Sequence, residues 1–239
     1  MSGIQAITFD FWNTLFREDN REERHRMRCE GFAARTGVAL DRVLEVQGEV
    51  HAEFFRTHVR EQRTLNPVDA VRMTATRLGV ALGETDETEL TELFATAIYT
   101  FPPVPIEGAL DAVRAAQSHV PVAVISDSGM NPGYVLRRFL DEHGFTGLLT
   151  AAVFSDEEGV AKPHPRMFHA AAEKLGVAPQ ALLHIGDLDP TDIVGVQRLG
   201  GQGALFTAVN SRFAETTTAE HTFACWAAFR DALPGLMAG

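Results

Sequence analysis

The sequence is poor in cysteine and in long apolar runs. Of its 239 residues only Cys29 and Cys225 are cysteines. Two cysteines are too few for a disulfide framework or for a zinc site with four cysteine ligands. No apolar stretch approaches the roughly 18 residues of a membrane-spanning helix. The first residues, 1–5, lack the basic and apolar segments of a signal peptide. We therefore expect a cytoplasmic protein with reduced thiols and no membrane partner.

Positive charge is also scarce. The chain has 21 basic and 32 acidic side chains and a formal net charge of −11 at pH 7, and only Lys162 and Lys174 are lysines. Proteins that bind nucleic acids need clustered positive charge against the phosphate backbone. This balance therefore argues against a nucleic-acid partner. The composition carries no information on the oligomeric state.

Short apolar runs rich in β-branched residues alternate with helical periodicity along most of the chain. The runs, which we expect to form buried strands, are residues 4–11, 120–126, 148–154, 182–186 and 203–207. Helical spacing covers residues 107–118 and 191–199, and a further helix begins at Pro165 and ends at Gly176. Strands that alternate with helices predict an α/β fold with a Rossmann-like, doubly wound parallel sheet.

The segment after the first strand is different. Residues 16–100 have no strand pattern and show helical periodicity over residues 22–36, 41–62, 67–78 and 87–99. Asn66 and Pro67 suit the cap and the first position of the third of these helices. We therefore predict an α/β core domain formed by residues 1–15 and 101–239, interrupted by a helical domain of residues 16–100.

Polar residues occur at the predicted ends of several strands. Asp10 ends the first strand, Ser126 the second and Asp187 the fourth, with Asp192 five residues further on; Lys162 lies in the loop after the third. In an open parallel sheet, ligands bind beyond the carboxyl ends of the strands. We therefore expect these side chains to meet in one crevice.

That grouping has a chemical logic. Crowded carboxylates repel one another and raise each other's pKa unless a cation is present. A hard divalent ion such as Mg²⁺ resolves the conflict, and its other coordination positions can hold a phosphate. Phosphate oxygens also suit a serine hydroxyl, backbone N–H groups and a lysine. Asp10 can then attack phosphorus and form an aspartyl-phosphate.

Four segments resemble the four motifs of the haloacid dehalogenase (HAD) superfamily, in the family's order. Residues 9–15, Phe-Asp-Phe-Trp-Asn-Thr-Leu, are similar to the first motif, Asp-x-Asp-x-Thr-Leu, and residues 125–129, Ile-Ser-Asp-Ser-Gly, to the second, a Ser or Thr at a strand end. Residues 162–165, Lys-Pro-His-Pro, resemble the third, Lys-Pro-x-Pro, and residues 186–192 resemble the fourth, Gly-Asp-x-x-x-x-Asp. The helical segment falls where the C1-type cap of subfamily I lies in that family.

The resemblance implies a magnesium site. Asp10 would be both the nucleophile and a metal ligand, and the backbone carbonyl of Trp12 and the side chain of Asp187 would be further ligands. Asp192 would support the metal, directly behind the ligands or through water.

The resemblance also implies a phosphoryl site. Ser126 and the N–H groups of Asp127 and Ser128 would hold the phosphoryl oxygens, and Lys162 would neutralise the nucleophile and the transferring group. The cap would close over the site and select a small phosphorylated metabolite, since it leaves little room for a macromolecule.

Residue 12 departs from the pattern of the family's phosphatases, which have a second aspartate there. That aspartate protonates the leaving oxygen and later activates water. The indole of Trp12 has one N–H donor and no acceptor, so it cannot act as a general acid or base. Losing such a group typically lowers the rate by about 10²–10⁴-fold. We expect Trp12 to form an apolar wall of the substrate pocket instead.

The interpretation we favour is a phosphohydrolase that works without an aspartate at residue 12 as its general acid and base. Either the leaving group needs no proton, or another residue supplies it: His164, Asp127, Asp189 or a residue of the cap.

Two alternatives stay open. The dehalogenase branch of the family has an aromatic residue at this position and attacks carbon without metal, but it has Ser-Asn where this chain has Ser126-Asp127, and it lacks the fourth motif. The other alternative is a non-catalytic binding protein. It predicts loss of the site, whereas the site residues are all present: Asp10, Ser126, Lys162 and Asp187.

Overall fold

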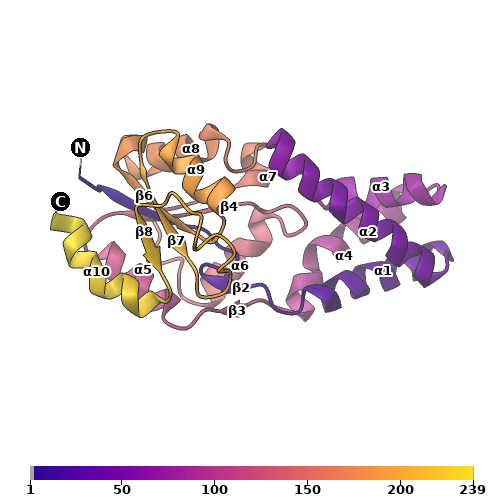
Figure 1. The fold of residues 1–239 in the computed structure, drawn as a ribbon. Helices are drawn as coiled ribbons and strands as arrows, with labels where there is room; N and C mark the ends of the chain where they lie inside the picture. Colours follow the sequence, from indigo (N-terminus) through magenta and orange to yellow (C-terminus); the bar gives the residue numbers. More distant parts are fainter. Residues whose placement is uncertain (1–2, 239) are drawn as a thin grey trace.

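The chain folds into a sheet with flanking helices at one end and a group of helices at the other (Figure 1). This computed structural model describes residues 3–238. Residues 1–2 and 239, at the two ends of the predicted core domain, therefore lie outside the described residues, and residues 1–2 are also the first of the five that lack signal-peptide features. Among residues 3–238 no helix combines the length and the apolar character that a membrane crossing requires.

The main sheet has six parallel strands in the order β5-β4-β1-β6-β7-β8. They are β1 (Ala6–Phe9), β4 (Val122–Ser126), β5 (Ala151–Phe154), β6 (Leu182–Gly186), β7 (Gln202–Phe206) and β8 (His221–Phe223). The chain places β1 in the middle, adds β4 and β5 on one side, and then crosses to β6 on the other. The predicted α/β fold with a doubly wound parallel sheet is confirmed.

Helices cover both faces of this sheet. One face packs against α5 (Ala109–Gln117), α6 (Gly133–Glu142) and α10 (Trp226–Ala238), and the other against α8 (Pro165–Leu175) and α9 (Val194–Gln197). Alternate residues of β1 show the two faces: Ile7 and Phe9 belong to the first core and Ala6 to the second. The strands are buried on both sides, which explains why they read as continuous apolar runs.

Several element boundaries differ from the predicted ones. The first strand ends at Phe9 rather than at residue 11, because the carbonyl of Phe11 accepts hydrogen bonds from the N–H groups of Leu15 and Phe16 and turns the chain back. The predicted helix over residues 191–199 is a π-helical turn, η3 (Asp189–Ile193), followed by α9. Neither β8 nor α10 was predicted.

The helical segment consists of α1 (Arg21–Thr36), α2 (Leu40–Arg56), the π-helical turn η1 (Thr57–Glu61), α3 (Pro67–Leu78) and α4 (Glu84–Thr100). Its apolar faces form a separate core that includes Phe32, Val46, Val71 and Phe94. Asn66 caps α3 as predicted, since its side chain accepts the N–H of Asp69 and Asp69 accepts the N–H of Asn66.

Two linkers join this segment to the sheet. They form a short antiparallel pair, β2 (Phe16–Arg17) with β3 (Val104–Pro105), which is not among the predicted strands. The buried guanidinium of Arg24 donates from Nη1 to the carbonyl oxygens of Asp19, 2.8 Å away, and Phe101, 2.9 Å away. Arg24 thereby holds the two linkers together. The division into a core of residues 1–15 and 101–239 and a cap of residues 16–100 stays a prediction.

Candidate active site

Three neighbouring strands deliver polar residues to one edge of the sheet. Asp10 follows β1, Ser126 ends β4 and Asp187 follows β6, and these strands are adjacent. A cavity of about 390 Å³ lies beyond this edge, between the sheet and the helical segment. The predicted site residues that line it are Asp10, Trp12, Asp127, Ser128, Lys162, Asp187 and Asp192. Ser126 is fully buried and is not among the lining residues.

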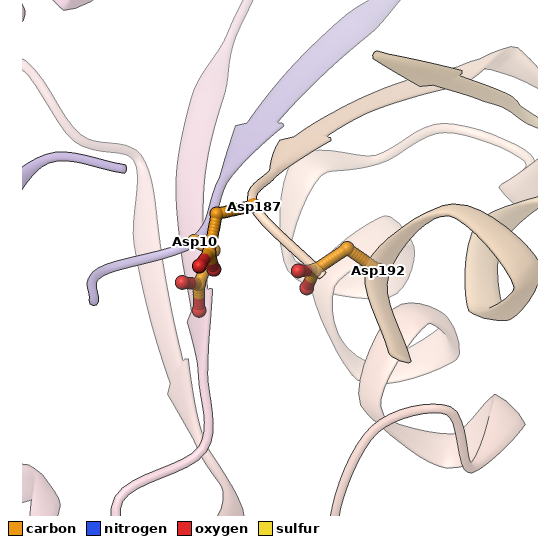
Figure 2. Close-up of side chains that lie close together, drawn as sticks. All are labelled: Asp10, Asp187 and Asp192. Carbon is orange, nitrogen blue, oxygen red and sulfur yellow. The ribbon is translucent and has the colours of Figure 1, made fainter. Parts of the chain in front are cut away.

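Three carboxylates form a cluster in this cavity. One oxygen from each of Asp10, Asp187 and Asp192 lies within 4.8 Å of the others, and all three residues are buried. Figure 2 shows Asp10 and Asp187 together at the ends of their strands, with Asp192 facing them from the following turn. Clustered carboxylate oxygens are the donors that hard divalent cations such as Mg²⁺ prefer. These three residues can therefore hold such an ion.

Lys162 connects two of these carboxylates. Its Nζ lies 2.6 Å from Asp10 Oδ1 and 2.6 Å from Asp192 Oδ1, and it donates to the carbonyl of Ile125 at 3.1 Å. Burial would lower the pKa of this lysine, but Asp10 and Asp192 raise it above its ordinary value. Lys162 is therefore an ammonium ion with all three donors engaged.

The charges of the cluster do not balance. Burial, together with Asp192 and Asp187, raises the pKa of Asp10 well above its ordinary value despite the nearby Lys162. Burial and Asp192 raise the pKa of Asp187 to about 6. The pKa of Asp192 shifts in the opposite direction. Burial would raise it, but Lys162 and His184 hold it below the ordinary value. Three carboxylates face one ammonium, so full ionisation calls for a further cation.

Two supporting residues were not predicted. His184, in β6, lies with Nε2 3.1 Å from Asp192 Oδ1 and with Nδ1 2.8 Å from the hydroxyl of Thr8. Asn210 donates to Asp187 Oδ2 at 2.9 Å. His184 interrupts an otherwise apolar strand, which is a usable signal. Asn210 lies in a loop and has no such signal.

The polar groups of the loop after β4 are engaged with neighbouring loops. Asp127 Oδ1 accepts the N–H of Lys162 at 2.9 Å, and Asp127 Oδ2 lies 3.0 Å from His58 Nε2. The N–H of Ser128 donates to Ser155 Oγ at 2.9 Å, and its hydroxyl bonds Asp156. The N–H of Ser128 is thus already paired, and its predicted role toward a phosphoryl group stays a prediction.

Trp12 forms part of the cavity wall. Its ring packs edge-on against Phe11, with centroids 5.0 Å apart, and the guanidinium of Arg24 lies 5.9 Å from the Trp12 ring. Of the residues considered as a replacement acid, His164 caps α8 and Asp189 bonds Thr217, and neither lines the cavity.

Gly186 leaves the space that Asp192 occupies. A Cβ at residue 186 would lie 2.2 Å from Asp192 Cγ. The Asp192 side chain could move away only by breaking its contacts with Lys162 and His184. We expect Gly186→Ala to lower the free energy of unfolding by about 1–3 kcal/mol, the usual cost of overpacking, and to weaken Mg²⁺ binding. Chemical denaturation and calorimetric titration with Mg²⁺ measure both.

Gly48→Ala is the matched control. Gly48 is exposed within α2 with open space around its Cβ position, so this change should keep Mg²⁺ binding and leave stability equal or higher by about 0.5–1 kcal/mol. Equal Mg²⁺ affinity and stability in Gly186→Ala and the parent protein would contradict the packing argument.

The raised pKa of Asp187 gives stability a definite pH dependence. The folded protein binds this proton more tightly than the unfolded chain, so its contribution to stability is lost as pH rises through about 6. In EDTA, Asp187→Asn should therefore be more stable than wild type at about pH 7.5, and the gain should shrink toward about pH 5. Saturating Mg²⁺ should reverse the order at the higher pH. Thermal melts at both pH values test this prediction. If Asp187→Asn in EDTA is less stable than the wild type at both pH values, the prediction is wrong.

Known proteins share parts of this sequence. A profile of the haloacid dehalogenase-like hydrolases matches residues 4–200. Over 48 residues, 20% of this chain, the sequence is 46% identical to glyceraldehyde 3-phosphate phosphatase of Methanopyrus kandleri, and the match covers 21% of that protein. The enzyme of the same name from Pyrococcus furiosus is 40% identical over 48 residues, 20% of each chain. The chain thus spans about a fifth of the length of the curated relatives it matches.

Solved structures resemble the whole chain. A HAD phosphatase from Thermococcus onnurineus superposes with a TM-score of 0.70 at 17% identity, covering 97% of this chain and 99% of that one. A 2-haloacid dehalogenase from Pseudomonas syringae pv. Tomato DC3000 does so with a TM-score of 0.71 at 17% identity, covering 98% of each. At such identities the likeness concerns the fold alone. Since the family profile covers most of the chain and its four motifs, the protein belongs to the haloacid dehalogenase-like hydrolases.

Proposed function

We propose that the protein is a Mg²⁺-dependent phosphohydrolase that acts on a small phosphorylated metabolite through an aspartyl-phosphate. The observation that carries this proposal is the buried cluster of three carboxylates around one ammonium at the end of the central strand. A phosphate ester brings more negative charge, which such a cluster tolerates only beside an added cation.

The residues present fit Mg²⁺. Asp10, Asp187 and Asp192 supply oxygen donors within one ion's reach, and Lys162 engages Oδ1 of Asp10 and of Asp192. The second oxygen of Asp10 and the side chain of Asp187, held by Asn210, remain for a metal, with the carbonyl of Trp12 as a further proposed ligand. A bound Mg²⁺ would neutralise charge on the phosphoryl oxygens.

Asp10 is the proposed nucleophile. It follows directly on β1, and Lys162 fixes one of its oxygens, so the other can be aimed at phosphorus. Lys162 remains charged throughout and lowers the cost of bringing a phosphoryl group next to carboxylates. Ser126 and the loop of Asp127 and Ser128 are the proposed contacts of the phosphoryl oxygens.

The helical segment is the proposed C1-type cap. It contributes much of the cavity wall, including Arg24, Arg28, Phe54 and His58. A cavity of about 390 Å³ between the sheet and the helical segment has a size that suits a small molecule. The partial relatives are phosphatases named for a small phosphorylated metabolite, which agrees with this substrate class.

A paired assay tests the proposal against its alternatives. We expect purified protein to release phosphate from small phosphate esters with Mg²⁺ and to lose this activity in EDTA, because the carboxylate cluster needs the cation. Halide release from short 2-haloacids in EDTA would instead establish the dehalogenase alternative, to which Trp12 points. Absence of both activities would favour a binding protein.

Asp10→Asn should lower phosphate release by a factor on the order of 10⁴ or more, as expected for loss of a nucleophile. The matched control is Asp231→Asn, the same change at an exposed residue of α10, which should keep full activity. Mg²⁺-dependent activity that survives Asp10→Asn would overturn the proposed nucleophile.

A further inference from the structure

The cavity that contains Asp10 also contains a paired histidine and aspartate. His58, from η1, and Asp127, from the loop after β4, both line it. His58 Nε2 lies 3.0 Å from Asp127 Oδ2, and the side chains are 25% and 19% exposed. The pair is therefore partly accessible from the cavity rather than sealed in the core.

The position of His58 is fixed through its own side chain and through the residue that follows its turn. Gln62, which follows η1 with φ 52°, accepts the N–H of Ala161 on its carbonyl oxygen at 2.9 Å. Asp127 Oδ1 meanwhile accepts the N–H of Lys162 at 2.9 Å. The turn is thus attached to the two loops that carry Asp127 and Lys162, and His58 cannot leave the site without breaking these contacts.

We propose that His58, oriented by Asp127, is the general acid and base of phosphoester hydrolysis in this protein, in the role that Trp12 cannot perform. This inference rests on the proposed phosphohydrolase function. It deepens that function by naming the substrate class: a phosphate monoester of an aliphatic alcohol, whose leaving oxygen requires a proton.

The hydrogen bond to Asp127 selects which ring nitrogen reacts. A carboxylate acceptor keeps a proton on Nε2, so Nδ1 is the atom that gains and loses one. In the first step an Asp10 oxygen bonds to phosphorus, the bond from phosphorus to the alcohol oxygen breaks, and Nδ1–H of His58 gives its proton to that oxygen. The products are the free alcohol, aspartyl-phosphate and neutral imidazole.

The second step restores the residue. Neutral Nδ1 takes a proton from water as the water oxygen bonds to phosphorus, and the bond from phosphorus to Asp10 breaks. Phosphate leaves, Asp10 is again a carboxylate and His58 an imidazolium. One water is consumed for each ester, and no oxidant or further reactant is needed.

The charged groups around His58 support this use. Burial and Lys162 lower its pKa, whereas the adjacent Asp127 and the more distant Asp192 raise it, and the net effect is a pKa above the ordinary value for histidine. A histidine of this kind is protonated over a larger part of the neutral range, as a general acid requires.

A merely structural role as a contact between the helical segment and the sheet predicts different kinetics. His58→Gln separates the two, because the amide nitrogen of glutamine can still donate to Asp127 but cannot transfer a proton. Arg60→Gln, on the exposed side of the same turn, is the matched control. Thermal melts with and without Mg²⁺ establish that each variant is folded.

The measurement is kcat/KM, which ends at phosphoryl transfer to Asp10, for glycerol 2-phosphate and for p-nitrophenyl phosphate. We expect His58→Gln to lower it by about 10²–10⁴-fold for glycerol 2-phosphate, and by less than about tenfold for p-nitrophenyl phosphate, whose leaving group needs little acid assistance. With glycerol 2-phosphate, kcat/KM of the wild type should decline at high pH as His58 loses its proton, and this decline should be absent in His58→Gln. A burst of p-nitrophenolate should appear, because the second step has lost its base. Arg60→Gln should behave as wild type.

Equal loss with both substrates, or no loss with either, overturns the role of His58 and leaves the phosphohydrolase proposal intact. If His58→Gln is unfolded, the same measurements are made on Asp127→Asn. A neutral partner should lower the pKa of His58, so the decline of kcat/KM at high pH should move to lower pH. An unchanged decline would show that Asp127 does not act through His58. If wild type cleaves neither ester, the proposed function itself fails and this inference with it.

Discussion

The buried ammonium of Lys162 between Asp10 and Asp192 is the interaction on which the rest of the site depends. Removing three charged groups from water costs several kcal/mol for each ion, and such clusters are weak contributors to stability. Their presence here is better explained by a ligand that completes the charge balance. Around this contact the chain adds neutral support: His184 orients Asp192, and Asn210 orients Asp187. We propose that this set of buried oxygens binds a cation and a phosphoryl group.

The topology of the sheet explains why these residues meet. The first strand lies in the centre, so Asp10 has β4 on one side and β6 on the other, and the residues that follow these three strands line the same cavity. The chain leaves the sheet soon after β1, forms the helical segment, and returns to the sheet at β4. The helical segment therefore lies over that edge (Figure 1). Arg24 holds the two linkers together, while His58 and Gln62 contact the loops of the site. The opposing wall of the cavity is therefore built from residues remote in sequence.

Much of this arrangement could be predicted from the sequence, for identifiable reasons. Asp10, Asp187, Asp192 and Lys162 follow apolar strands or their loops, and the carboxyl ends of parallel strands share one edge. The helix of Pro67 and the strand of residues 182–186 have clear end signals and match the predicted ranges. His58 could not be predicted, because its partner Asp127 is 69 residues away and only the packing of two separate cores brings them together. The strand β8 is only three residues long, too short for a periodic signal.

The central claim is that Asp10 carries the phosphoryl group during turnover. The most direct test is acid quenching of the protein during reaction with p-nitrophenyl phosphate and Mg²⁺, followed by mass spectrometry of the peptide that contains Asp10. The account predicts one added phosphoryl group on Asp10, absent in EDTA. Turnover with Asp10 unmodified in a quench that preserves acyl phosphates, or a phosphoryl group on another residue, would contradict it.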